Sequence, residues 1–241
     1  MFPLKDDVPT LTTPFITVGL IALNILVFLY QVSLQGLGSA EGARATRDLI
    51  LEFGLVPCRL TGVCETGVSV LPPALTVLTS MFLHGGLLHL GGNMLYLWIF
   101  GNNVEDTLGH ARFLLFYLAS GVAAAAAQTA LSAGSSVPMI GASGAVSGVL
   151  GAYLLLFPRA NVLTLIVVGF FVRVVRIPAV VVLGFWFLVQ FVSGFITWSG
   201  RVGAGGEVAW FAHLGGFLSG MALLLLLRRR GPWARGPSHS W

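Results

Sequence analysis

The sequence predicts an all-α membrane protein built as a bundle of six transmembrane helices. Only 9% of its 241 residues are charged, 56% are hydrophobic and the mean hydropathy is +0.90. This composition excludes an ordinary soluble domain. A span needs about 20 apolar residues, so the length accommodates roughly six spans and their loops. The 31 glycines are typical of transmembrane helices whose backbones approach closely.

Six apolar stretches account for most of the chain. We expect spans at about 14–34, 83–102, 112–132, 143–157, 178–198 and 207–227. The first stretch is longer than the apolar core of a cleaved signal peptide, so it is interpreted as a signal anchor. The chain is therefore divided into an N-terminal segment 1–13, a helical domain 14–228 with a long external loop at about 35–78, and a basic tail 229–241.

The basic residues orient this bundle. With both termini cytoplasmic, nine of the thirteen Lys and Arg residues fall inside: Lys5, Arg112, Arg159, Arg173, Arg176, Arg228, Arg229, Arg230 and Arg235. Four fall outside: Arg44, Arg47, Arg59 and Arg201. A seventh span at 162–172 would place the cluster Arg228–Arg230 outside, against the positive-inside rule. This short apolar segment is therefore expected to be interfacial or re-entrant. The expected location is a bacterial plasma (inner) membrane.

Two polar residues stand at matching depths in separate spans. Ser143 precedes Pro158 by 15 residues, and His213 precedes Arg228 by the same number. At the rise of an α-helix, each lies about 22 Å above the inner boundary. In a hydrocarbon core about 30 Å thick, both then lie about 8 Å below the outer surface.

A serine hydroxyl becomes a good nucleophile only when a base removes its proton. His213 is the only histidine in spans four to six, and no carboxylate lies deep in a span, so the pattern favours a Ser-His dyad over a triad. Unpaired N–H groups at the start of the helix near Ser143 suit a developing oxyanion. The alternative for Gly141-Ala142-Ser143-Gly144 is a contact between small residues on neighbouring helices.

The second span carries further polar candidates. His89 and Asn93 are four residues apart and share one helix face. Asn93 is either an interhelical hydrogen-bonding group or, with His89 and the Ser143 N–H, an oxyanion donor. His84 lies nearer the surface, where hydrogen bonding to the long loop is its expected role.

Small residues recur every four positions in two spans. Ala212, Gly216 and Gly220 form one stripe, and Gly144, Gly148 and Ala152 form the other. If the stripes meet, Ser143 and His213 come within hydrogen-bonding distance.

The remaining candidates concern cross-links, metals and nucleic acids. Cys58 and Cys64 lie in the external loop, where a local disulfide is expected. Two cysteines cannot build a structural zinc site, and no metal is expected. The net charge of +4 comes from membrane-flanking residues, so no nucleic-acid partner is expected.

Three ordered motifs resemble the rhomboid family of intramembrane serine proteases. They are His84…His89…Asn93 in an HGGxxHLxxNM pattern, Gly141-x-Ser143-Gly144, and Ala212-His213 followed by Gly216 and Gly220. Glu105, at the inner end of the second span, also matches. The resemblance covers about residues 76–227.

The resemblance implies a six-helix rhomboid-like bundle whose Ser143–His213 dyad cleaves single-span membrane proteins in or beside their transmembrane helix. It implies oxyanion stabilisation by His89, Asn93 and the Ser143 N–H, and no metal or small-molecule cofactor. The fifth span, with Phe185, Trp186 and Gln190, resembles the lateral gate for substrate.

One departure from the family pattern concerns the first loop. Many rhomboids carry a Trp-Arg pair there, but no Trp precedes Trp98 in this chain, so the loop needs another anchor, for which Cys58–Cys64 is a candidate. The segment 162–177 is longer than in the smallest members and has no assigned role. Two other functions stay open: a catalytically inactive relative that binds membrane helices, and a small transporter, although no internal repeat supports the latter.

Overall fold

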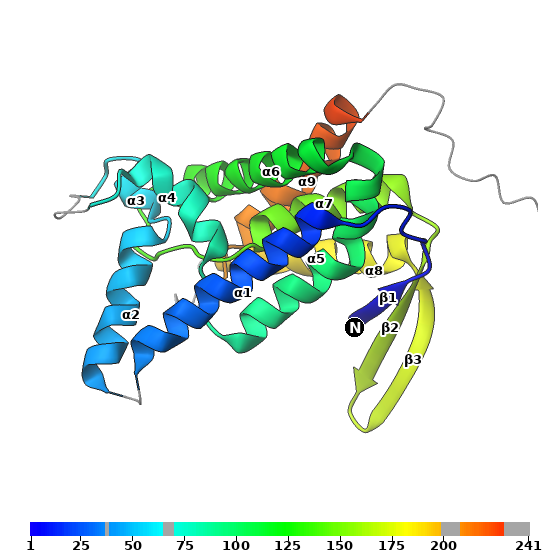
Figure 1. The fold of residues 1–241 in the computed structure, drawn as a ribbon, viewed down its shortest axis with the longest axis horizontal. Helices are drawn as coiled ribbons and strands as arrows, with labels where there is room; N and C mark the ends of the chain where they lie inside the picture. The colour runs from blue at the N-terminus through cyan, green and yellow to red at the C-terminus, as the bar shows by residue number, and fades with distance from the viewer. Residues whose placement is uncertain (37–38, 65–69, 199–207, 229–241) are drawn as a thin grey trace, which may run out of the picture.

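The protein is described by a computed structural model that covers residues 1–36, 39–64, 70–198 and 208–228. Four helices are long and apolar enough to cross a membrane. They are α1 (Phe15–Gln35), α6 (His110–Leu131), α8 (Ala179–Trp198) and α9 (Trp210–Leu227). The predicted helical membrane architecture is confirmed, and the predicted tail 229–241 lies outside the described residues (Figure 1).

The other two predicted spans have a different form. The second is a bent pair: α4 (Pro73–Thr79) with the short 3-10 helix η1 (Ser80–Phe82) meets α5 (Leu87–Leu108) at 82°. The break falls at Gly85-Gly86, where the chain carries no side chain to resist the turn. The fourth is α7 (Ser143–Leu156), which has only 14 residues. The bundle therefore contains one bent and one short helix in place of two full spans.

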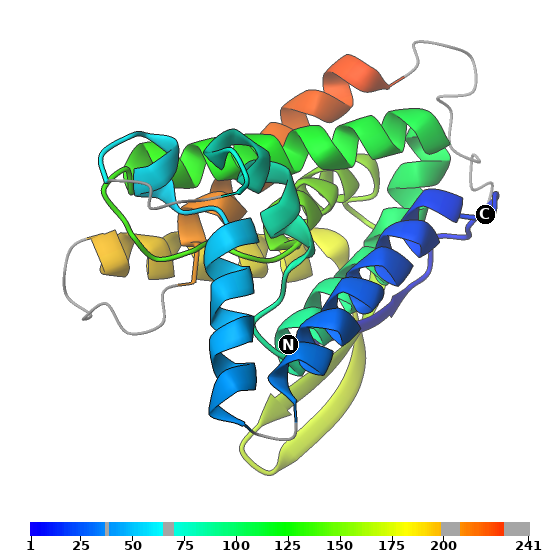
Figure 2. The same cartoon turned by 60° about the vertical axis from the view of Figure 1, so that its left-hand side comes forward.

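Helix α7 is the centre of the bundle. Ten of its residues are buried, because it is predominantly apolar and packs against α5, α6 and α9. Small residues allow close approach on the α9 side: a Cβ added at Gly216 would lie 2.1 Å from the Gly144 carbonyl oxygen. One added at Gly220 would lie 2.2 Å from the Gly148 oxygen. The two predicted stripes do meet, and α6 lies beside α9 over this region (Figure 2).

The loop predicted at 35–78 is largely folded. It holds α2 (Ala40–Phe53), α3 (Pro57–Leu60) and α4, at the end of the bundle opposite the strands (Figure 1). Ser39 caps α2 by accepting a hydrogen bond from the Gly42 N–H. The expected polar loop is thus a small helical subdomain on the bundle.

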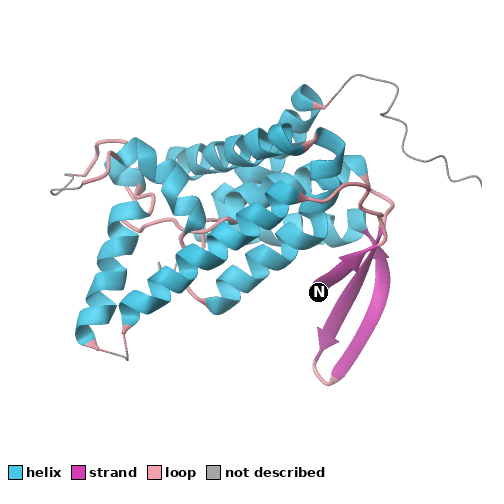
Figure 3. Ribbon diagram, in the orientation of Figure 1, coloured by secondary structure: helices cyan, strands magenta, loops and turns pink. Residues whose placement is uncertain are grey.

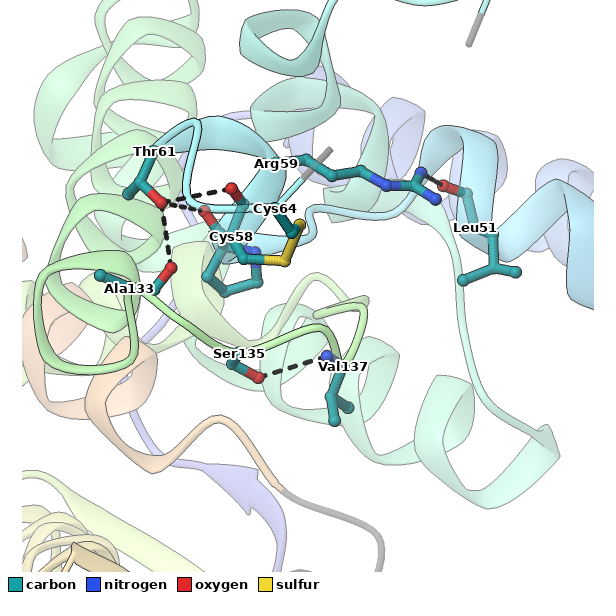
Figure 4. The surroundings of a disulfide bond; sticks show 9 residues. Leu51, Cys58, Arg59, Thr61, Cys64, Ala133, Ser135 and Val137 are labelled. Carbon is teal, nitrogen blue, oxygen red and sulfur yellow. Dashed lines mark hydrogen bonds between the residues drawn. A yellow bond between two sulfur atoms is a disulfide. The ribbon is translucent and has the colours of Figure 1, made fainter. Parts of the chain in front are cut away.

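A disulfide anchors this subdomain. Cys58 and Cys64 are bonded (Figure 4). The Cys58 N–H donates to the Ser135 carbonyl on the linker before α7. The Thr61 hydroxyl donates to the Ala133 carbonyl, and the Arg59 guanidinium donates to the Leu51 carbonyl. The cross-linked turn therefore fastens this subdomain to the linker before α7, in a chain that has no Trp before Trp98.

A three-stranded antiparallel sheet is the main difference from an all-α fold (Figure 3). Strand β1 (Phe2–Asp6) pairs with β2 (Asn161–Val168), which pairs with β3 (Phe171–Pro178). The segment 162–172, expected to be interfacial or re-entrant, is a strand, a turn at Gly169 (φ 57°) and the start of the next strand. Its β-branched residues favour a strand. Pairing with β1 supplies hydrogen-bond partners for the backbone of β2 on the side away from β3.

Two buried carboxylates connect this end of the molecule to the bundle. Glu105 of α5 accepts hydrogen bonds from the N–H groups of Ile16 and Thr17, and so caps the start of α1. Asp6 of β1 accepts a hydrogen bond of 2.6 Å from the Tyr153 hydroxyl of α7. Burial raises the pKa of the Asp6 carboxyl above its usual value, and the Tyr153 bond partly opposes that rise.

Candidate active site

A cavity of about 490 Å³ opens among the helices of the bundle. Residues of α4, η1, α5, α6, α7, α8 and α9 line it, together with the segment that leads into α7. Its polar lining includes Ser143, His213, His89 and Asn93. The structure therefore brings residues from the three predicted motifs to one cavity.

Ser143 and His213 face each other across this cavity. The Ser143 Oγ lies 2.7 Å from the His213 Nε2. Ser143 is the first residue of α7 and His213 lies in the first turn of α9, so two helix starts meet here. The pairing follows from the close approach of Gly144 and Gly216, one and three residues farther along the same helices.

Helix α8 completes the surroundings of His213. The His213 Nδ1 lies 2.7 Å from the Gln190 Oε1, and the Trp186 and His213 ring centroids are 5.9 Å apart. Gln190 is buried, whereas Phe185 is half exposed on the outside of α8. Of the three residues assigned to a gate by resemblance, two therefore face inward and contact the histidine.

Polar groups that could bind an oxyanion surround Gly141. Its φ of 122° and the nearby His89 ring, whose Nε2 would lie 2.8 Å from an added Cβ, require glycine. The His89 Nδ1 accepts a hydrogen bond of 3.3 Å from the Gly85 N–H. In a neutral ring, Nε2 then carries the proton. The Asn93 Nδ2 is buried and unpartnered within the described part of the chain.

His84 has a different environment. Its backbone N–H donates to the Gln31 Oε1, and the Gln31 Nε2 donates to the His84 carbonyl. Its ring lies edge-on to His89, with centroids 5.1 Å apart. His84 thus connects the bend before α5 to α1 and lies against the ring of His89. The sequence instead predicted that His84 hydrogen-bonds to the long loop.

Sequence reasoning missed two glutamines, Gln31 and Gln128, and assigned Gln190 to the gate without its contact to His213. Gln31 binds the backbone of His84, Gln190 binds the ring of His213, and the Gln128 Oε1 of α6 accepts from the Ala212 N–H at the start of α9. A polar amide in an apolar span is costly unless bonded. This cost indicates from sequence that each glutamine has a hydrogen-bond partner, but it does not identify which residue that partner is.

The described residues contain no group of three or more His, Cys, Asp or Glu side chains that could hold a metal. Glu207, the carboxylate nearest the sixth span in sequence, falls outside the described residues. What the described cavity offers is a hydroxyl, an imidazole and several hydrogen-bond donors.

A family model of the rhomboid domain matches residues 73–230, which include all the cavity residues named above. The chain belongs to the rhomboid family. It is 32% identical over 210 residues to rhomboid protease GluP of Bacillus subtilis (strain 168), covering 87% of this chain and 35% of that protein.

Other rhomboid relatives are mitochondrial. Rhomboid protein 1, mitochondrial, of Saccharomyces cerevisiae is 32% identical over 61% of this chain and 40% of its own length. The human presenilin-associated rhomboid-like protein, mitochondrial, is 31% identical over 59% of this chain and 33% of its own length. The chain thus spans only about a third to two fifths of the length of these relatives.

Proposed function

We propose that this rhomboid is an intramembrane serine endopeptidase that cleaves single-span membrane proteins through a Ser143–His213 dyad. The observation that carries the proposal is the 2.7 Å contact between the Ser143 Oγ and the His213 Nε2 inside the cavity. The relationship to a rhomboid protease of Bacillus subtilis supports the same class of reaction.

The first half of the reaction forms an acyl-enzyme. The His213 Nε2 removes the Ser143 proton while Oγ attacks the carbonyl carbon of the scissile peptide bond. The imidazolium then protonates the leaving nitrogen, the C–N bond breaks, and Ser143 holds the new carboxyl end of the substrate as an ester. In the second half, His213 deprotonates a water, which attacks that ester and releases the serine.

The oxyanion formed in each half needs donors. We assign this role to the unpartnered Asn93 Nδ2, the His89 Nε2–H and the Ser143 backbone N–H at the start of α7. Each can donate without reorganising a helix.

The substrate must be extended at the cleaved bond. An intact helix bonds its own carbonyl groups and hides them from a nucleophile. We therefore expect small or helix-breaking residues near the cleavage site. We keep the bacterial plasma membrane as the proposed location, with the cavity toward its outer side and both termini inside.

Purified protein in vesicles with a single-span model substrate tests this function. Wild type should cleave the substrate and react with a serine-directed phosphonate, whereas Ser143→Ala and His213→Ala should do neither. Ser219→Ala is the matched control, because Ser219 lies on α9 and bonds only to the Gly216 carbonyl among the described residues. If Ser143→Ala cleaved as fast as wild type, the proposal would fail, and a helix-binding role would replace it.

A further inference from the structure

The imidazole of His213 needs one particular tautomer to act as a base. To accept the serine proton, its Nε2 must carry a lone pair, so the proton of the neutral ring must reside on Nδ1. Nothing in Ser143 enforces that choice, because a hydroxyl can either donate or accept. A partner on the other ring nitrogen is required.

Gln190 is that partner in this structure. Its Oε1, which can only accept, lies 2.7 Å from the His213 Nδ1, so Nδ1 donates. The Gln190 side chain is buried, so its contact with Nδ1 is shielded from bulk water. Trp186, one helical turn earlier on α8, packs beside the ring of His213 and limits its rotation.

We propose that Gln190 is a positioning residue that holds His213 in the tautomer and orientation required for general-base catalysis. It acts through His213 and does not contact the substrate. The active unit is then a serine, a histidine and a neutral amide, contributed by α7, α9 and α8. This inference rests on the proposed protease function.

The amide also differs from a carboxylate in a measurable way. A carboxylate at position 190 would still accept from Nδ1 and would in addition stabilise the imidazolium. The other titratable side chains that line the cavity within the described residues are His89 and Tyr96, both on α5. Both are present in wild type and in the variants below, so they contribute equally to each pH–rate profile.

The test compares Gln190→Leu and Gln190→Glu with wild type in the vesicle cleavage assay. Loss of one neutral hydrogen bond predicts about a tenfold lower kcat for Gln190→Leu with KM unchanged. Gln190→Glu should retain kcat at high pH, with the acid limb of its pH–rate profile moved to higher pH. Val189→Ala, at an exposed neighbouring position on α8, is the matched control and should behave as wild type.

A wild-type kcat in Gln190→Leu would overturn the inference. So would a Gln190→Glu profile whose acid limb coincides with that of wild type, and this arm remains decisive if Gln190→Leu fails to fold. Nitrogen-15 NMR of the histidine rings gives a readout independent of proteolysis. It should find His213 protonated on Nδ1 in wild type and in mixed tautomers in Gln190→Leu. A wild type whose His213 is protonated on Nε2 would refute the positioning role of Gln190, whereas the labelling of Ser143 tests the protease function separately.

A second, independent observation concerns the β2–β3 hairpin. Its tip is exposed and apolar: Phe170 is 104% and Phe171 is 79% exposed, and Val168 and Val172 beside them are also exposed. The segment 161–178 contains two arginines and no acidic residue. Such a tip in water would leave two phenyl rings unburied, which is unfavourable.

The position of the hairpin determines which surface it can reach. Its root joins the end of α7 to the start of α8, and the Ala179 N–H donates to the Ala160 carbonyl. Strand β1, at the N-terminus, pairs with β2, so the hairpin lies on the N-terminal side of the bundle (Figure 1). By the distribution of basic residues, that side is cytoplasmic.

We propose that the hairpin tip inserts into the headgroup region of the inner leaflet, with its arginines on anionic lipids. Phenyl rings gain by burying their apolar area at the boundary between headgroups and acyl chains, and each basic residue near an anionic surface adds about 1 kcal/mol. Arg173 and Arg176 supply the charge, and Phe170 and Phe171 supply the apolar contact. The hairpin would then fix the inner ends of α7 and α8 relative to the bilayer.

A fluorophore on Phe170→Cys tests this proposal, since both native cysteines are in the disulfide. In vesicles that contain anionic lipid, spin-labelled lipids should quench it at least threefold more than they quench the same fluorophore on Glu41→Cys in α2. The difference should shrink in zwitterionic vesicles. Quenching by aqueous iodide equal to that of the control, or self-quenching that grows with protein density and indicates a second copy, would overturn it.

Discussion

The spacing of α7 and α9 should control catalysis through their crossing at Gly144 and Gly216, which lies beside the Ser143–His213 contact but does not include either residue. At the crossing, a Cβ added to Gly216 would lie 2.1 Å from the carbonyl oxygen and 3.0 Å from the carbonyl carbon of Gly144. Ordinary contacts begin at 3.4 Å. Both obstructing atoms are backbone, so no side-chain rotation can relieve the clash. Gly216→Ala therefore requires the helices to separate by about 1.3 Å.

This separation would act directly on the dyad. Ser143 and His213 lie one and three residues from the crossing, and their 2.7 Å contact would lengthen beyond the range of a good hydrogen bond. A displacement of about 1 Å can lower a catalytic rate about 10²-fold. Overpacking of this kind also costs about 1–3 kcal/mol of stability.

The assay is kcat for substrate cleavage together with the thermal midpoint of unfolding in the same detergent. Gly216→Ala should show about a 10²-fold lower kcat while remaining folded at assay temperature. Gly19→Ala on α1 is the control, because a Cβ there meets nothing within 4 Å, so it should be neutral or slightly stabilising. A Gly216→Ala enzyme with wild-type kcat would refute the reasoning, since the dyad would then tolerate a wider crossing.

Three further outcomes are expected. Asn93→Ala should lower kcat about 10²- to 10³-fold with little change in KM, measured by steady-state cleavage, if its amide binds the oxyanion. Asp6→Asn should reveal a pH-dependent difference in thermal stability. Because the pKa of Asp6 is raised in the folded protein, the contribution of its carboxyl to stability is complete below the unfolded pKa of about 3.9 and is lost as pH rises through the folded pKa. The thermal stability of wild type relative to Asp6→Asn should therefore increase as pH is lowered. Replacing Cys58 and Cys64 by Ser should cost about 2 kcal/mol of stability in thermal unfolding, and a reductant should destabilise wild type but not that variant.

The helices were predictable because a helix that crosses the hydrocarbon core of a membrane needs about 20 consecutive apolar residues. Helices α1, α6, α8 and α9 begin within three residues of the predicted boundaries, since prolines and polar residues mark the ends of each apolar run. The bend before α5 was not predicted. His84-Gly85-Gly86 has no spanning signal of its own, and its geometry depends on Gln31 of a different helix.

The sheet was missed for a different reason. The β-branched run 162–172 is compatible with a strand. The partner of β2 on one side, β3, follows it directly in sequence, but the partner on the other side is the segment Phe2–Asp6, about 160 residues earlier. That N-terminal segment has neither the alternation nor the length of a convincing strand. Only the fold brings the two together, with the Tyr153–Asp6 hydrogen bond at the edge of the bundle.

We expect the depth of the site in the membrane to follow from the shortness of α7. Its 14 residues extend about 21 Å, less than the roughly 30 Å of hydrocarbon. If the inner ends of α7 and α9 lie at one level, the start of α7 must stop below the outer surface. Ser143 is the first residue of that short helix, and the segment that leads to it must descend beside α5 and α9. A full-length span would fill this space with its own first turns, so the missing turns are what allow a polar cavity to form around Ser143.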